Sequence, residues 1–247
     1  MGGLYLLALL AALAAAPAAA QDDDGLEPPD PVLRPQSAAA ASDPGFYLAR
    51  AATAAGAGDY DRAIEDCSTA LKLDPKLAQA YEDRGVAYYY KENCAASVRD
   101  LDRAARLAPD RPSVYYNRGL CQARLKRYGK AIADFTKAAA LDPGLSTAYN
   151  SRGLAWAMRG RHERAIADFT RAIKLAAENP DAYINRATSY AISGRYGEAV
   201  ADYTEAIRLN PDLPQPYLGR AKVFGLLGRP ERAAADEAKA KSLLRGY

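Results

Sequence analysis

Histidine is almost absent from this chain: His162 is the only one among 247 residues. Any mechanism that pairs a serine or cysteine nucleophile with an imidazole base would have to use it. No second His or Cys stands near it at the spacing of a metal site, and no glycine motif of the kind that cradles phosphate occurs. We therefore interpret His162 as a packing residue and predict a protein that is not an enzyme and uses no cofactor and no metal.

Cysteine is also scarce. Cys67, Cys94 and Cys121 follow one another at intervals of 27 residues, a spacing without meaning for metal binding. In an oxidising compartment one disulfide can form, and folding the chain about a turn near Ala108 brings Cys94 level with Cys121. This pair is the candidate disulfide, with Cys67 free, and three free buried thiols are the alternative.

Long apolar runs are missing after residue 20, where no segment approaches the roughly 20 apolar residues of a membrane helix. The first twenty residues carry no charged side chain, run apolar over residues 4–15, and end on three alanines before Gln21. This pattern predicts a secretory signal cleaved after Ala20, and hence a periplasmic or secreted protein without a membrane span after its removal. Because the amino terminus is the only positive charge before the apolar run, an uncleaved anchor remains the alternative.

Residues 21–43 contain four prolines and six acidic residues against the single Arg34, a net charge of −5. Such a stretch buries too little apolar surface to offset chain entropy, so we predict a disordered, Pro-rich acidic linker. The remaining residues, 44–247, carry a net charge of +8. A basic body favours solubility and local steering, and it also leaves nucleic-acid binding open as an alternative function.

A period of 34 residues fills the rest of the chain. Counted from Pro44, six repeats end at Tyr247 without remainder: 44–77, 78–111, 112–145, 146–179, 180–213 and 214–247. Place 4 of each repeat is Tyr, place 8 is Ala or Gly, and place 27 is Ala throughout. Small residues at fixed places let two helix backbones approach, and large ones fill the remaining space, so the pattern is a helix-packing pattern.

Several repeats also have an aromatic residue at place 11, such as Trp156, several have one at place 24, such as Phe169, and Pro recurs at place 32. With these residues the chain resembles the tetratricopeptide repeat family over residues 44–247. The resemblance implies an all-α, right-handed superhelical solenoid of six antiparallel helix pairs, whose first helices line a concave groove. Glu237 stands in the last repeat where the others carry a large apolar residue or Cys67, so residues 231–245 are predicted to form a polar cap, with Pro230 at the first turn of its helix.

Arginine at place 7 and aspartate at place 23 also recur in all six repeats. An arginine ladder for phosphate is one interpretation, but antiparallel helices bring place 7 level with place 23, so we predict structural ion pairs that fix helix register. The end residues Arg50 and Asp236 are expected to be the ones that lack a partner. The predicted ion-pair residues are Arg84, Arg118, Arg152, Arg186, Asp66, Asp100, Asp134 and Asp168.

One face of each first helix remains free of these packing roles. It mixes amides, tyrosines and apolar residues with few cations, which suits an extended peptide whose backbone bonds the amides. Asn117 and Asn185 are the strongest candidates; ordinary solvated positions, with partners on the convex face, are the alternative. The predicted groove residues are Glu82, Tyr89, Tyr116, Asn117, Leu120, Asn150, Leu154, Ile184 and Asn185.

The sequence therefore predicts an exported, non-catalytic scaffold that binds a protein or extended peptide in its groove, in envelope assembly or complex formation. The alternative is a basic helical-repeat protein that binds nucleic acid. The groove with few cations and the export signal count against that alternative, and the identity of the partner is not predicted.

Overall fold

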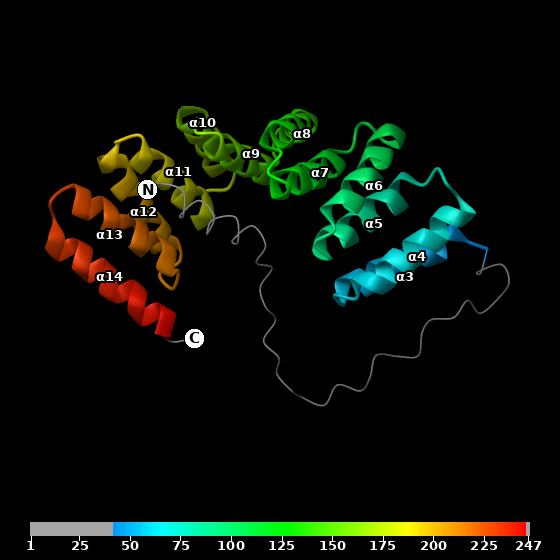
Figure 1. The fold of residues 1–247 in the computed structure, drawn as a ribbon, viewed down its shortest axis with the longest axis horizontal. Coiled ribbons are helices and arrows are strands. Elements are labelled where there is room, and N and C mark those ends of the chain that lie inside the picture. Colours follow the sequence, from blue (N-terminus) through cyan, green and yellow to red (C-terminus); the bar gives the residue numbers. More distant parts are fainter. Residues whose placement is uncertain (1–41, 246–247) are drawn as a thin grey trace. The chain divides into compact units, whose positions relative to one another are not determined.

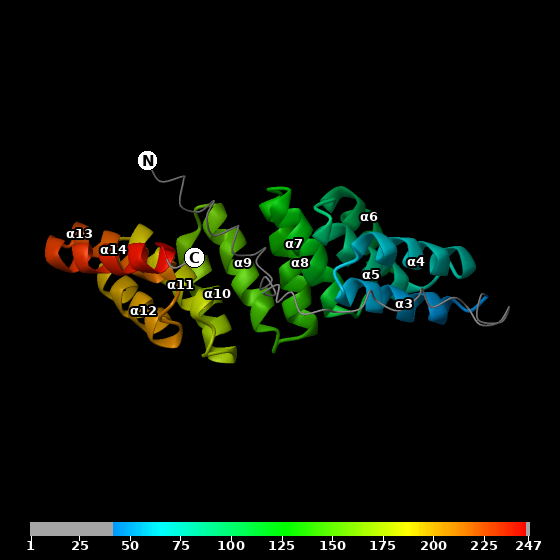
Figure 2. The ribbon, with the colours of Figure 1, turned by 90° about the horizontal axis from the view of Figure 1, so that it is seen from below.

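The computed structural model describes residues 42–245, and this part of the chain forms twelve α-helices and no strand (Figures 1 and 2). The helices are α3 Pro44–Gly56, α4 Tyr60–Leu73, α5 Ala78–Tyr90, α6 Cys94–Leu107, α7 Pro112–Arg124, α8 Tyr128–Leu141, α9 Ser146–Met158, α10 His162–Leu175, α11 Pro180–Ile192, α12 Tyr196–Leu209, α13 Pro214–Leu226 and α14 Pro230–Arg245. The predicted signal peptide, its cleavage site and residues 21–41 of the predicted linker lie outside the described residues.

The helices form six pairs that follow the period of the sequence. Every first helix begins at place 1 of its repeat and every second helix at place 17. Between them, place 15 takes a left-handed backbone: Gly160, for example, has a φ of 72°. Glycine adopts this conformation without steric penalty, which explains why four repeats carry it there. The structure thus confirms the predicted all-α helical-repeat solenoid of six helix pairs.

The chain divides into two compact units, one ending at Asp110 with α3–α6 and one beginning at Arg111 with α7–α14. Within each unit, a second helix packs on the first helix of its own pair and on the first helix of the following pair. In the first unit the interior is made mostly of alanines, with Leu71 and Leu101 as its larger aliphatic members.

In the second unit, small and large residues interlock as the period predicts. Phe135 and Phe169 are fully buried. A Cβ built on Gly119 would lie 2.6 Å from the Phe135 ring, and one built on Gly153 would lie 2.6 Å from the Phe169 ring. The ring of each second helix therefore occupies the space that the missing side chain leaves on its partner helix.

Two buried rows were not predicted. Places 3 and 10 of the first helices are small or apolar and buried in every repeat after the first. They are Ala80, Val114, Ala148, Ala182 and Pro216 at place 3, and Ala87, Cys121, Ala155, Ser189 and Val223 at place 10.

The last helix has the character predicted for a cap. α14 begins at Pro230, and only Asp236 and Ala240 of its residues are buried. Glu237 is exposed, so the outer face of the final pair is polar and exposed to solvent. Between Ser42 and Arg245, none of the helices combines the length and apolar character needed to cross a bilayer.

Candidate peptide-binding face

Arg–Asp pairs hold the two helices of each repeat together. The Arg152 Nε donates to Asp168 Oδ2 at 2.8 Å and its Nη2 donates to Asp168 Oδ1 at 2.6 Å. This bond to a carboxylate holds the pKa of Arg152 above its ordinary value. The same two-bond geometry occurs in all six repeats, in Arg50–Asp66, Arg84–Asp100, Arg118–Asp134, Arg152–Asp168, Arg186–Asp202 and Arg220–Asp236.

The expectation that Arg50 and Asp236 lack partners is therefore wrong. Every arginine bonds the aspartate 16 residues ahead, within its own repeat, so neither end of the array loses a partner. The link to the preceding repeat is a hydroxyl that the sequence analysis missed. The third nitrogen, Nη1, of Arg152 donates to Thr136 Oγ1 at 3.1 Å, and that of Arg84 donates to Ser68 Oγ at 2.9 Å.

These contacts fix the first helices of the second unit, α7, α9, α11 and α13, as consecutive neighbours (Figure 1). Two predicted groove residues, Ile184 and Asn185 of α11, are buried, with exposed fractions of 7% and 5%. The others in this unit are half-buried: Tyr116, Asn117, Leu120, Asn150 and Leu154. The face is more enclosed than an ordinary solvated helix surface.

Two of the predicted amides meet across neighbouring first helices. Asn185 Nδ2 donates to Asn150 Oδ1 at 3.2 Å. Asn150 Nδ2 and Asn185 Oδ1 take no part in this bond. The asparagine pair thus has an amide NH₂ group and an amide oxygen outside the bond, and these are the kinds of group that a peptide bond pairs with.

The apolar residues of this face partly serve the core. The Tyr116 and Phe135 ring centroids lie 5.8 Å apart, and Leu120 packs on the same cluster as Tyr116. The most exposed apolar side chains of these first helices are instead at place 13, where Ile192 is 52% and Leu226 is 65% exposed. The nine predicted residues do not include them, although their place in the repeat was a usable signal.

The remaining two predicted groove residues belong to α5 in the first unit. Glu82 is buried, with 6% of its surface exposed. Tyr89 is half-buried and meets Tyr90 edge to face at 5.6 Å, while Tyr90 stacks on Tyr60 at 4.8 Å. These tyrosines already have aromatic partners within the unit.

The three cysteines are buried free thiols. Cys94 and Cys121 belong to different compact units and are not joined in the structure, so their disulfide stays a prediction. Burial, with a smaller effect of the Asp83 charge, raises the pKa of Cys67 to about 12. This thiol is therefore protonated at neutral pH and a weak nucleophile.

His162 is half-buried at the first position of α10, and its Nδ1 is enclosed without a hydrogen-bond partner. Burial lowers the pKa of His162 below its ordinary value. No set of three His, Cys, Asp or Glu side chains in the described part of the chain is placed to hold a metal ion.

Two family models match the chain. One, described as "Tetratricopeptide repeat", matches residues 82–146 and 146–181, and the other, described as "TPR repeat", matches residues 57–91 and 187–228. Together they cover more than half of the 247 residues. The chain is a tetratricopeptide repeat protein. A comparison with curated proteins finds no match.

Solved structures of other tetratricopeptide repeat proteins share this fold. PilW, a type IV pilus biogenesis factor, is 24% identical with a TM-score of 0.73 over 81% of this chain and 92% of its own. MamA is 23% identical with a TM-score of 0.63 over 68% of this chain and 92% of its own. YrrB, described as having an unusual peptide-binding site, is 23% identical with a TM-score of 0.62 over 71% of this chain and 90% of its own. Identities this low establish the fold alone.

Proposed function

We propose that this tetratricopeptide repeat protein is an exported, non-catalytic scaffold that binds an extended peptide segment of a partner protein on the first helices of its second unit. The asparagine pair on α9 and α11 is the observation that carries the proposal. In the proposed complex, Asn185 Oδ1 accepts from a peptide N–H and Asn150 Nδ2 donates to a peptide C=O, since neither atom takes part in the bond between the two asparagines.

The side chains around this pair favour a peptide over a small molecule. Leu154 and Leu120 are half-buried on α9 and α7, so each offers part of its surface to an apolar side chain of a ligand. Desolvation of such residues around a few amide bonds is typical of peptide recognition. The description of YrrB as a protein with a peptide-binding site gives this proposal support by analogy.

Export rests on residues 1–20, whose uncharged apolar run precedes small residues. A place in the cell envelope is supported by the description of PilW as a pilus biogenesis factor. If export occurs as proposed, the mature protein isolated from the periplasm or medium has Gln21 as its first residue. An intact Met1 on a membrane-bound protein would instead identify an uncleaved anchor.

Site-specific photocrosslinking in the native host tests the peptide-binding face. A photoreactive amino acid at Leu154 should crosslink to a partner, whereas one at the exposed Ala167 on α10 should not. Changing Asn150 or Asn117 to Ala should weaken the Leu154 crosslink while circular dichroism stays unchanged. Equal crosslinking from Leu154 and Ala167 would contradict binding on this face. An unchanged crosslink in both asparagine variants would show that the asparagines do not hold the partner.

Nucleic-acid binding is the second candidate, because residues 111–245 carry 23 Lys and Arg against 13 Asp and Glu, a net charge of +10. It predicts that the purified mature protein retains RNA and releases it as the salt concentration rises. Absence of retained RNA at low salt would remove this candidate.

A further inference from the structure

Positive charge is concentrated in the second compact unit. Its net charge of +10 compares with −3 for residues 42–110, which carry 9 Lys and Arg against 12 Asp and Glu. Four of the arginines in the second unit are held by the aspartates of their own repeats. These four pairs cancel, so the whole excess of positive charge belongs to other side chains.

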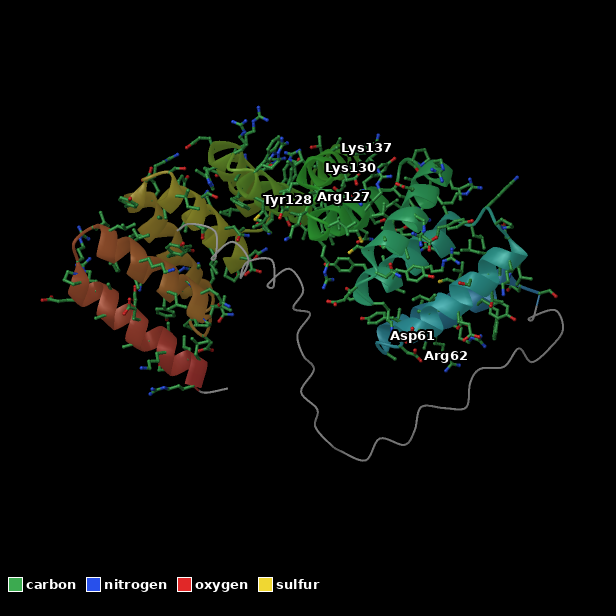
Figure 3. All side chains as sticks on the ribbon, viewed as in Figure 1. Asp61, Arg62, Arg127, Tyr128, Lys130 and Lys137 are labelled. Atoms are coloured by element: carbon green, nitrogen blue, oxygen red, sulfur yellow. The ribbon has the colours of Figure 1, made fainter. Side chains whose placement is uncertain are left out.

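Six cations at or beside the turns that join α7 to α8 and α9 to α10 are exposed, and we call them the basic turn cluster. Figure 3 labels two of them, Arg127 and Lys130. They are Lys126, Arg127, Lys130, Arg159, Arg161 and Arg164. An open pocket joins the two turns, since Arg159 lines it together with Lys126, Arg127 and Lys130. None of the ion pairs found between Ser42 and Arg245 engages Lys126, Arg127 or Lys130.

Local backbone stability does not explain these cations. The place of Arg127 is arginine in the last four repeats but Asp59 and Asn93 in the first two. The side-chain oxygens of Asp59 and Asn93 accept from the backbone N–H of Arg62 and Ala96 at 3.0 and 3.1 Å. Arg127 and Arg161 occupy the same N-cap position without a side-chain bond to the helix. Asp and Asn are preferred at N-caps, and a positive charge at a helix N-terminus is unfavourable.

Lys126 departs from the local preference in the same way. Its φ is 59°, in the left-handed region, at the place where Gly160 stands in the next repeat with a φ of 72°. A lysine there strains the backbone where glycine would not. Two adjacent positions of one turn thus carry a cation where the turn itself favours Gly followed by Asp or Asn.

We propose that the basic turn cluster binds a short acidic segment of a partner protein. Guanidinium groups bind carboxylates through paired hydrogen bonds, and lysines add compact positive charge. Arg164 lies 4.7 Å and Arg159 5.9 Å from the Trp156 ring, contacts that restrain both guanidinium groups before a ligand arrives.

The extent of the cluster favours an acidic peptide over nucleic acid. In the next repeat, Arg195 lies 2.9 Å from Glu198 and 3.7 Å from Glu163, so its charge is already neutralised. A phosphate backbone that continued along the turns would meet these carboxylates. The free positive charge spans two turns, a length that suits a few carboxylates.

This site stands apart from the proposed peptide-binding face, because none of its six residues belongs to that face. The two proposals therefore fail separately. Absence of a crosslink from Leu154 would contradict the peptide-binding face and leave the basic turn cluster untouched. Substitutions in the turns test only the basic turn cluster.

The test uses the full mature chain with two substitutions, Lys126→Gly and Arg127→Asp, that lower the charge of the cluster by three and give this turn the residues of the first repeat, Gly58 and Asp59. A control, Lys239→Ala with Lys241→Glu, makes the same change in net charge at exposed positions of α14. The probe is a fluorescein-labelled 12-residue peptide with six glutamates alternating with glycine or serine. A 12-nucleotide single-stranded RNA serves as the competing class of anion.

We expect the turn variant to bind the acidic peptide at least about tenfold more weakly than the unchanged chain, and the control variant to lose less than about threefold. Its Tm should rise by about 2–4 °C, because a cap is gained and strain is relieved, so unfolding cannot explain the loss. Equal loss in both variants would show that only net charge matters and would overturn the proposal.

Tighter binding of the RNA than of the peptide would overturn it in favour of nucleic acid. A lower Tm in the turn variant would refute the argument from local preference. In that case Lys130→Glu, which leaves the turn backbone untouched, repeats the binding comparison. Unchanged peptide binding in Lys130→Glu would then end the proposal.

Discussion

Replacing Asp168 by alanine leaves the Arg152 guanidinium in a partly closed site without its carboxylate. The side chains of Arg152 and Asp168 are 19% and 11% exposed. Removing one partner of a fully buried ion pair costs about 3–5 kcal/mol, because the remaining charge is uncompensated. Arg152 keeps its bond to Thr136 and some solvent contact, so we expect the low end, about 3 kcal/mol.

A surface pair in the same unit provides the matched control. Arg208 and Glu205 form a bond of 2.7 Å, but their side chains are 66% and 36% exposed. Glu205→Ala should therefore reduce the free energy of unfolding far less than Asp168→Ala does. Urea titrations followed by circular dichroism at pH 7 compare both variants with the unchanged chain.

A third variant separates pairing from packing. Arg152→Met combined with Asp168→Leu removes both charges together and keeps apolar volume in the site. It should recover most of the stability that Asp168→Ala loses. Two results would refute the reasoning that each charge compensates the other in a site shielded from water. One is that Asp168→Ala lowers the free energy of unfolding no more than Glu205→Ala does, and the other is that the double variant is as unstable as Asp168→Ala.

Three further outcomes are expected. Gly153→Ala should destabilise the chain by about 1–3 kcal/mol in urea titrations, because the added Cβ would press on the Phe169 ring. Gly225→Ala serves as the control: it has open space around it and should be neutral or stabilising by up to about 1 kcal/mol. Burial lowers the pKa of His162, so the unfolded chain binds a proton at this imidazole more readily than the folded chain does. The free energy of unfolding should therefore fall as the pH drops from about 6.5 through the lowered pKa. His162→Tyr should remove this part of the dependence of Tm on pH, and identical Tm profiles for the variant and the unchanged chain would contradict the expectation. With a pKa of about 12, Cys67 should resist iodoacetamide at pH 8 until urea unfolds the protein, as peptide mass spectrometry can show.

The positions of the helices could be predicted from the sequence because each repeat has the same local signals. The period fixes where first and second helices begin, and the small residue at place 8 anticipates the close approach of Gly153 to Phe169. These relations join residues about 16 apart in adjacent antiparallel helices. Short-range packing of this kind repeats identically and can be read from one repeat.

The choice between partners one repeat apart was not determined by the period. Arg84 has Asp100 16 residues ahead and Asp66 18 residues behind. In a strictly periodic sequence either aspartate is an equally good candidate partner. The structure selects the aspartate ahead and gives the other side of Arg84 to Ser68. The distance between neighbouring helix pairs decides this, and it depends on the volumes packed between them.

The candidate sites show the same division. The mixture of amides and apolar residues on the first helices was predicted, and within the second unit the predicted residues lie on α7, α9 and α11, which are neighbours in space. The bond between Asn150 and Asn185, the enclosure of Ile184 and the pocket shared by Arg127 and Arg159 were not. By itself, the sequence determined the period, the helices and which residue types each face carries, because these follow from local backbone preferences and contacts within one repeat. Only the tertiary structure decided which side chains of successive repeats meet, because that depends on how the helix pairs stack.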